Sequence, residues 1–248
     1  MTHISNWGED ANQVYRVGSE IRSLSQHEGE AHSIVVVLSG GMDSATLLAL
    51  AHYMKPEKMI GLTFDYGQRH DKEIEKAKEL GWHYEVDVRT IPLNGLAAIF
   101  RTALSKSSDI AIPDHAREGT IPPTYVPFRN SIFLSIALGY AESWGYDKVF
   151  YGANAVDYSG YPDCRPAFLD SMNMVAYSYD TKISVEAPVM YLSKSEIVKL
   201  GSVLKVPWEK TWSCYRGEHQ ACGKCPSCEF RIKGFKEADI KDPIAYAR

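Results

Sequence analysis

Residues Ser33–Ser44 read Ser-Ile-Val-Val-Val-Leu-Ser-Gly-Gly-Met-Asp-Ser, a short apolar run followed by two glycines. The apolar part has no polar alternation, which is typical of a strand buried on both faces of a parallel sheet. After Asp43 the apolar residues recur at helical spacing, so a helix is predicted to begin there. The glycines allow a tight turn, and the N–H groups at the start of the helix have no partner within it. This stretch therefore predicts an anion site for phosphate or pyrophosphate.

The glycine turn differs from two familiar nucleotide loops, because it has neither the Walker A lysine nor the G-x-G-x-x-G spacing. Ser39–Ser44 instead resembles the S-G-G-x-D-S signature of the PP-loop ATP pyrophosphatases, which split ATP into AMP and pyrophosphate. An ordinary strand–turn–helix corner capped by its polar side chains is the alternative. The setting between a buried strand and an amphipathic helix favours the nucleotide loop. The residues predicted to bind ATP are Ser39, Gly40, Gly41, Met42, Asp43 and Ser44, with Asp43 acting through Mg²⁺.

Length and charge narrow the class of protein. The 248 residues suffice for one α/β domain with an appendage, and the net charge of −4 provides no attraction toward nucleic acid. No apolar run reaches membrane-spanning length, and the N-terminus lacks the apolar core of a signal peptide. We therefore expect a cytoplasmic protein that acts on small molecules and has no membrane or nucleic-acid partner. The sequence leaves a homodimer open.

Strand and helix patterns alternate along the chain. Further strands are predicted at 59–66, 82–89, 148–151 and 183–189, and helices at 70–80, 91–104, 130–144, 165–178 and 193–204, with a long loop over 105–123. This alternation predicts a doubly wound parallel sheet of about five strands, of PP-loop, HUP-like type. Its ligand should lie at the carboxyl ends of the strands. The predicted organisation is an N-terminal extension (1–32), a nucleotide-binding domain (33–210), and a small zinc module with a C-terminal helix (211–248).

Polar and basic residues gather where predicted strands end and helices begin. Asp65, Gln68 and Arg69 lie at the end of the second strand and just after it, and are expected at the nucleotide. Arg129 opens a long helix, where a basic group opposes the helix dipole and favours an anion as its partner. Lys194 starts the last core helix and is interpreted either as a phosphate contact or as a solvated lysine. We count Asp43, Ser44, Arg129 and Lys194 as candidate catalytic residues.

Four of the five cysteines are clustered, at Cys214, Cys222, Cys225 and Cys228. Short C-x-x-C loops let two thiolates reach one ion while backbone N–H groups stabilise the charge on sulfur. Four sulfur ligands leave no position for water, so Zn²⁺ bound there is predicted to be structural. An iron–sulfur cluster is the first alternative and a redox dithiol the second.

Longer motifs point to one family. They are T-F-D-Y-G-Q-R-H at Thr63–His70, V-P-x-R-N at Val126–Asn130 and D-Y-S-G-Y-P-D-C-R at Asp157–Arg165. Together with the cysteine cluster, they resemble the 7-cyano-7-deazaguanine synthase (QueC) family, and the similarity runs in order from about Ser33 to Lys233. The resemblance implies ATP-dependent conversion of 7-carboxy-7-deazaguanine and ammonia to the 7-cyano compound in queuosine-type biosynthesis, with zinc on the four cysteines.

The loop after the fourth strand is expected to hold this substrate, since a carboxylate can accept from the N1–H and 2-amino groups of a guanine-like ring. The proposed substrate group is Asp157, Ser159, Asp163 and Arg165. The chain departs from the family pattern at Phe128, where glycine is usual, and at Ala167, where an acidic residue is usual. These departures keep open a related enzyme that joins the adenylated acid to another amine. A zinc-stabilised nucleic-acid-binding module is a further alternative, which the acidic charge balance opposes.

Overall fold

The computed structural model describes residues 32–69, 71–93, 95–106, 108–115, 121–156, 161–217 and 219–247. They belong to one compact unit, His32–Arg248. The predicted extension over 1–32 lies outside the described residues apart from His32, and the predicted domain boundaries stay predictions. No helix within the described ranges is both long enough and apolar enough to cross a membrane.

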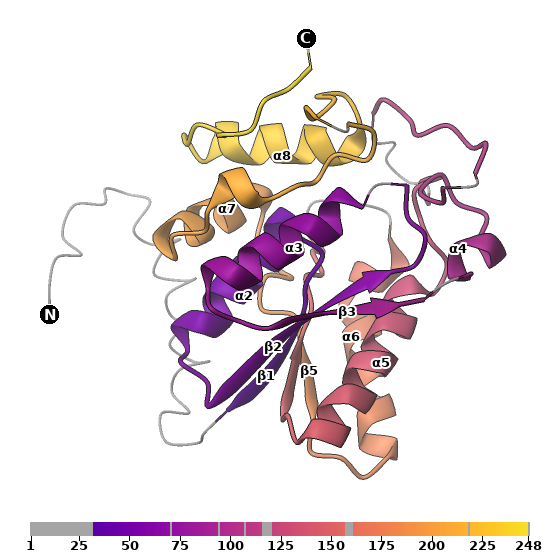
Figure 1. Cartoon of the computed structure of the whole chain (residues 1–248), viewed down its shortest axis with the longest axis vertical. Helices are drawn as coiled ribbons and strands as arrows, with labels where there is room; N and C mark the ends of the chain where they lie inside the picture. The colour runs from indigo at the N-terminus through magenta and orange to yellow at the C-terminus, as the bar shows by residue number, and fades with distance from the viewer. Residues whose placement is uncertain are drawn as a thin grey trace, which may run out of the picture. The chain divides into compact units, whose positions relative to one another are not determined.

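A single parallel sheet organises this unit, with the strand order β3-β2-β1-β4-β5 (Figure 1). Its strands are β1 (Ser33–Val37), β2 (Lys58–Asp65), β3 (Val88–Pro92), β4 (Lys148–Phe150) and β5 (Ser184–Glu186). The strand order reverses direction between β1 and β4, so the carboxyl ends of these two strands mark the topological switch point. The predicted doubly wound sheet of five parallel strands is confirmed.

Helices cover both faces of the sheet (Figure 1). The helices α2 (Met42–Tyr53) and α3 (Lys72–His83) lie on one face, and α5 (Arg129–Trp144) and α6 (Pro166–Ser178) on the other. The chain then forms α7 (Lys194–Val203) and α8 (Pro226–Glu237), which pack against each other. Short elements complete the order: α4 (Leu96–Ile99) and the 3-10 turns η1 (Pro162–Cys164) and η2 (Trp208–Lys210).

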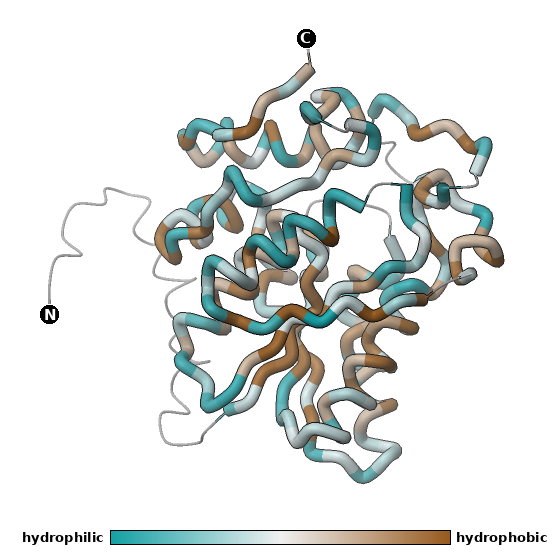
Figure 2. The backbone as a smooth tube through the Cα atoms, in the orientation of Figure 1, coloured by the Kyte–Doolittle hydropathy of each residue, from teal (hydrophilic) through white to brown (hydrophobic). Residues whose placement is uncertain are grey.

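The core lies on both sides of β1, as its unbroken apolar run predicts. Ile34, Val35 and Val36 are fully buried, and hydrophobic positions concentrate in the strands and on α5 (Figure 2). On the α5 side the Phe64 ring of β2 stacks on Phe133, with centroids 4.1 Å apart. Because the sheet is packed on both faces, the loops at its carboxyl edge are held in a defined arrangement.

Two predicted elements were wrong. The strand expected at 82–89 begins only at Val88, because α3 continues to His83 and is closed by a hydrogen bond from the Val86 N–H to the Gly81 carbonyl. The helix expected over 91–104 is reduced to the four residues of α4. Its predicted first residue, Ile91, pairs instead with Phe64 in the sheet. The spacing of apolar residues alone could not show whether these segments form strands or helices, since pairing in a sheet depends on residues far away in the sequence.

A buried arginine ties the C-terminal tail to the rest of the unit. The Arg231 guanidinium is 1% exposed and donates to both carboxylate oxygens of Asp242, at 2.8 and 2.9 Å. It also donates to Thr211 Oγ1 at 2.7 Å. Farther along the tail, the Ala221 N–H bonds to the Ala245 carbonyl, which places the tail beside the cysteine loop.

Candidate active site

The predicted anion loop lies at the turn between β1 and α2. Ser44 Oγ lies 3.0 Å from Ser39 Oγ, accepts from the Ser39 N–H at 3.2 Å, and donates to the Gly41 carbonyl at 3.2 Å. Gly41 is the N-cap of α2, and no side chain among the described residues caps this helix end. The first N–H groups of α2 are therefore available to an anion, and the helix dipole favours negative charge there.

The two glycines of the turn have different roles. Gly40 has a φ of +77°, and a Cβ on it would lie 2.4 Å from the Glu73 carbonyl oxygen of α3. Its own carbonyl accepts from the Trp212 N–H at 2.9 Å. Gly41 has a φ of −80°, and a Cβ there would meet only ordinary contacts at 3.4 Å and beyond. Gly40 is thus required for packing, whereas Gly41 lies at the surface that a ligand would approach.

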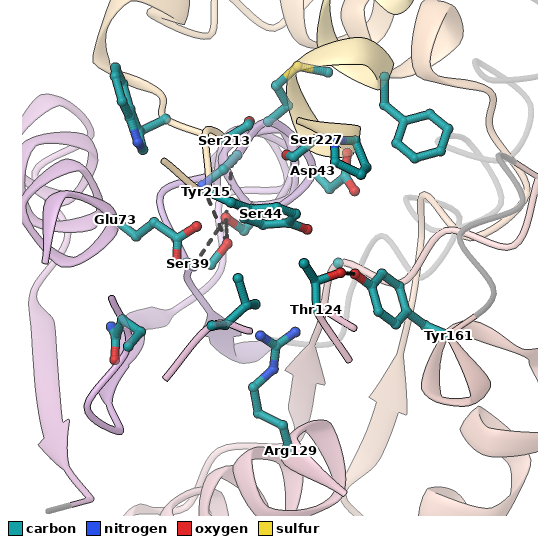
Figure 3. A pocket seen from close by; sticks show the side chains of 18 of the residues that line it. Ser39, Asp43, Ser44, Glu73, Thr124, Arg129, Tyr161, Ser213, Tyr215 and Ser227 are labelled. Carbon is teal, nitrogen blue, oxygen red and sulfur yellow. Dashed lines mark hydrogen bonds between the residues drawn. The ribbon is translucent and has the colours of Figure 1, made fainter. Parts of the chain in front are cut away.

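A cavity of about 790 Å³ opens at the carboxyl ends of β1 and β4, beside this loop. Figure 3 shows side chains from distant parts of the chain converging on it, with Ser39 and Ser44 at its centre. The predicted residues that line it are Ser39, Gly41, Met42, Asp43, Ser44, Gln68, Arg69, Arg129 and Lys194. Gly40 is outside the lining. This position at the switch point matches the expectation for a parallel α/β sheet.

An ion pair closes one side of the loop. The Lys194 ammonium lies 2.7 and 2.9 Å from the two carboxylate oxygens of Asp43. Lys194 is 14% and Asp43 24% exposed, so the pair is only partly open to solvent. Lys194 is therefore held at the cavity, in contrast to the solvated alternative.

Arg129 extends from the first turn of α5 into the cavity (Figure 3). Its Nη1 donates to Tyr66 Oη at 3.3 Å, and its buried Nε has no hydrogen-bond partner among the described residues. A half-satisfied guanidinium in a cavity favours a carboxylate or phosphate ligand, because these match its donor geometry.

Glu73, in the first turn of α3, is a cavity residue that the sequence analysis missed. Figure 3 shows its carboxylate directed toward the Ser39–Ser44 loop. Burial raises the pKa of Glu73 from 4.5 to about 7; nearby Arg129 lowers it and Cys214 raises it. The signal available in the sequence was an acidic residue at the start of the helix that follows the second strand.

Aromatic and hydroxyl groups form another wall that the sequence analysis did not anticipate. Thr124 Oγ1 and Tyr161 Oη lie 2.6 Å apart, and both residues line the cavity together with Tyr215 (Figure 3). Burial raises the pKa of Tyr215 well above its usual value, so its phenol is neutral. Such a wall suits a flat, partly polar ring.

The residues at the end of β2 and just after it have mainly structural contacts. Asp65 Oδ1 accepts from the Gly67 N–H at 3.2 Å, and the Gln68 amide bonds to the backbone of Tyr66 and Phe64. Arg69 donates to the Ser108 carbonyl at 2.7 Å and so fixes the loop that follows α4. Asp65 is not among the lining residues, and nucleotide contacts for this group remain a prediction.

The predicted substrate group is only partly described. Asp157 and Ser159 lie outside the described residues. Asp163 is buried but does not line the cavity. Burial raises its pKa, which Arg129 and backbone hydrogen bonds from Asp163 and Asn130 lower. Arg165 is exposed at the N-terminus of α6, and the structure does not bring it into the cavity.

The two departures from the family pattern also lie away from the cavity lining. The Phe128 side chain is 70% exposed, and its backbone has a φ of +55°, a region in which glycine is unstrained. Ala167 is exposed in the first turn of α6. Neither side chain fills the pocket beside Arg129.

The four predicted cysteines converge. All four sulfurs lie within 4.8 Å of one another. The 3.9 Å separation of Cys222 and Cys228 Sγ is close to the roughly 3.8 Å expected for a tetrahedral ion with metal–sulfur bonds of about 2.3 Å. Cys214 Sγ accepts backbone N–H groups from Arg216, Gly217 and Cys222 at 3.1–3.3 Å. Hydrogen bonds from other thiols and from these N–H groups lower the pKa of Cys214, which favours a metal-binding thiolate.

The cysteine cluster adjoins the cavity. Cys214 itself is a lining residue, and Trp212, two residues earlier, holds the Gly40 carbonyl. Lys72 of α3 lies 3.7 Å from the centre of the Trp212 ring. The segment that leads into the cluster is therefore packed against the anion loop.

A five-stranded parallel sheet with an S-G-G-x-D-S loop at its switch point defines a PP-loop type of enzyme fold. The chain has the same fold as a solved U34-tRNA thiolase, NcsA from Methanococcus maripaludis with its [4Fe-4S] cluster (TM-score 0.51, 14% identity, 94% of this chain and 74% of that one). At this identity the likeness concerns the fold alone.

Sequence comparison is more specific. Residues 33–239 match the family described as "Queuosine biosynthesis protein QueC". The 7-cyano-7-deazaguanine synthase of Thermoplasma volcanium is 49% identical over 221 residues, covering 86% of this chain and 90% of that protein. The synthase of Thermoplasma acidophilum is 46% identical over 228 residues, covering 88% and 94%. The chain belongs to the QueC family, as its motifs predicted, and its relatives are named as synthases.

Proposed function

We propose that this protein converts 7-carboxy-7-deazaguanine and ammonia into 7-cyano-7-deazaguanine, and that ATP activates first the acid and then the amide. The main observation behind the proposal is that the uncapped N-terminus of α2 and the Arg129 guanidinium line the same cavity. Membership of the QueC family and relatives named 7-cyano-7-deazaguanine synthase support the choice of substrate.

The proposed chemistry solves a problem of reactivity. A carboxylate resists nucleophiles, but its attack on the α-phosphate of ATP expels pyrophosphate and yields an acyl-adenylate. Ammonia displaces AMP from that adenylate and leaves an amide. A second ATP then activates the amide oxygen, and loss of AMP produces the nitrile. The protein contributes to catalysis mainly by positioning the reactants and by stabilising the charge on each departing pyrophosphate.

The residue roles follow from the cavity. The Ser39–Ser44 loop and the first turn of α2 are proposed to bind the pyrophosphate part of ATP, with Lys194 next to the phosphates. Arg129 is proposed to hold the substrate carboxylate or the α-phosphate. Mg²⁺ is bound in proteins through one or two carboxylates plus substrate phosphates, so Asp43 is the residue that would hold it, and the ion would neutralise phosphate charge.

We further propose that the four cysteines bind one structural Zn²⁺. Their sulfurs are close enough for a single tetrahedral ion. A [4Fe-4S] cluster places each thiolate on a different iron and needs a wider arrangement. Four sulfur ligands fill the coordination shell, so the ion would stabilise the 211–247 segment without meeting substrate.

The function is tested by incubating purified protein with ATP, ammonium and the acid, followed by mass spectrometry. We expect the nitrile with two AMP per product, and conversion of synthetic 7-amido-7-deazaguanine with one AMP and without ammonia. ADP as the main nucleotide product would overturn the loop assignment. An amide-linked conjugate in place of the nitrile, or an inert amide, would establish the amine-conjugating alternative.

A further inference from the structure

Two carboxylates line the cavity among the residues that the structure describes, Asp43 and Glu73. Lys194 binds the first at 2.7 and 2.9 Å. The Glu73 side chain makes neither a hydrogen bond nor a salt bridge with any described residue. Its carboxylate interacts electrostatically with Arg129 and Cys214 but is bonded to neither, so it is available to a ligand in the cavity.

The position of Glu73 is fixed by the anion loop itself. A Cβ on Gly40 would lie 2.4 Å from the Glu73 carbonyl and 2.9 Å from the Ala77 nitrogen, so α3 packs directly against the turn. The Glu73 carboxylate extends from this contact into the cavity, on the side of Ser39 and Ser44 (Figure 3). It thus lies beside the place where the reacting phosphate is expected.

A negative group next to a phosphate loop weakens ATP binding, so its presence requires another reason. The proposed reaction supplies one. Ammonium is the dominant form of ammonia at neutral pH, and its nitrogen ends as a nitrile nitrogen without hydrogen. Four protons must therefore leave that one atom.

We propose that Glu73 is the catalytic residue that accepts protons from this nitrogen in both halves of the reaction; this inference rests on the proposed function. His115 also lines the cavity, but its side chain is 75% exposed and bound to Glu229. A carboxyl group whose pKa burial raises to about 7 suits proton transfer near neutral pH.

In the first half, the Glu73 carboxylate takes one proton from ammonium. The nitrogen lone pair forms the C–N bond, the C–O bond to AMP breaks, and its electron pair leaves on the phosphate oxygen. A second N–H proton is lost as the amide forms. In the second half, the third proton leaves the nitrogen as the amide oxygen attacks the α-phosphate and displaces pyrophosphate. The fourth proton leaves as the C–O bond to AMP breaks and the C≡N bond is completed. Between steps each proton passes from Glu73 to water.

The test compares nucleophiles in Glu73→Gln. Hydroxylamine is largely uncharged at neutral pH and needs no prior deprotonation. We expect the variant to keep acid-dependent exchange of labelled pyrophosphate into ATP within about twofold. Hydroxamate formation should fall far less than ammonia capture, because only the N–H proton lost after the C–N bond forms still has to be accepted. Capture of ammonia and conversion of the amide to the nitrile should both fall about a hundredfold, within the range for loss of a general base. Glu75→Gln, an exposed carboxylate on the same helix turn, is the matched control and should change neither rate.

A different pattern would overturn the inference. If Glu73 instead binds the N–H edge of the ring, the KM values for acid and amide rise together, pyrophosphate exchange falls, and hydroxylamine restores nothing. Should Glu73→Gln fail to fold, Glu73→Asp keeps a carboxylate and should still favour hydroxylamine over ammonia more than wild type does; an unchanged ratio would refute the role. Wild-type protein that makes no nitrile refutes the proposed function, whereas a nitrile made equally well by Glu73→Gln refutes only this inference.

Discussion

Lys194 and Asp43 are 151 positions apart in the sequence, yet the Lys194 ammonium binds both oxygens of the Asp43 carboxylate. The contact forms because the N-termini of α7 and α2 meet at the same edge of the sheet. It neutralises a carboxylate in the turn of α2 that is proposed to receive phosphates. The pair therefore links the packing of α7 to the electrostatics of the anion loop.

Replacing the lysine should weaken nucleotide binding. Lys194→Ala leaves the Asp43 carboxylate uncompensated, and we expect the Kd for ATP to rise at least tenfold, equivalent to about 1.4 kcal/mol. Calorimetric titration checks this, with Lys199→Ala, outside the cavity lining, as the control. If repulsion by the carboxylate is the cause, adding Asp43→Asn should restore part of the affinity for ATP in the absence of Mg²⁺, when Asp43 has no ion to hold. An unchanged Kd in Lys194→Ala would contradict the role of the pair.

Substitutions of the two loop glycines should have different effects, one on stability and the other on ligand binding. Gly40→Ala places a Cβ 2.4 Å from the Glu73 carbonyl at a φ of +77°, so it should destabilise the protein by well over the roughly 1–2 kcal/mol of a left-handed residue. Gly41→Val should fold normally but abolish nucleotide turnover, because its branched side chain projects where a phosphate would approach. Urea unfolding and AMP release measure the two effects. Equal losses of stability in both variants would be inconsistent with this division.

Metal content should distinguish the clustered cysteines from the fifth. Wild-type protein is expected to retain one zinc per chain through dialysis, and Cys225→Ser should lose the metal and unfold at a lower temperature. Cys164→Ser removes a cysteine outside the cluster and should keep the metal. Elemental analysis decides the matter: iron with acid-labile sulfide would show that the cluster alternative is correct.

Glu73 should make stability depend on pH. The folded protein holds the Glu73 proton up to a pH of about 7, whereas an unperturbed glutamate releases it near 4.5. Between these values the folded state binds more protons, so its stability falls as pH rises, and the loss is complete above about 7. Glu73→Gln removes this loss and should melt at a higher temperature than wild type at pH 8. The difference should vanish below pH 4.5; a difference that persists there would mean that burial of the charge is not its cause.

Phe128 carries backbone strain that glycine would relieve. Its φ is +55° and its side chain is 70% exposed, so little packing is lost by removing it. Phe128→Gly should raise the unfolding free energy by up to about 1 kcal/mol, since relief of the left-handed conformation exceeds the added chain entropy. Phe128→Ala keeps the Cβ and should show no such gain. Thermal unfolding of the two variants provides the comparison, and nitrile formation should be unaffected in both.

Local sequence patterns determined the parts of the protein that depend on neighbours along the chain. The apolar run of β1 predicted a strand buried on both faces, and the serine–glycine stretch predicted the turn into α2 at its end. The cysteine spacing predicted that the four sulfurs converge, and they do, because short loops bring the thiolates of Cys222, Cys225 and Cys228 together. The ordered motifs were sufficient to predict the family.

Tertiary packing determined which side chains lie together in the cavity, which neighbours along the chain cannot determine. It joined Lys194 to Asp43 and turned Glu73 into the cavity by seating α3 on Gly40. It also left Arg165 exposed, although it shares a motif with residues at the cavity. Sequence spacing shows which residues share a strand or helix face, whereas the surroundings of a side chain depend on elements that lie far away in the sequence, as Lys194 does from Asp43. The protonation of the charged groups in the site depends on those distant contacts. Burial and nearby opposite charge, not local helix or strand propensity, determine the pKa of a carboxyl group.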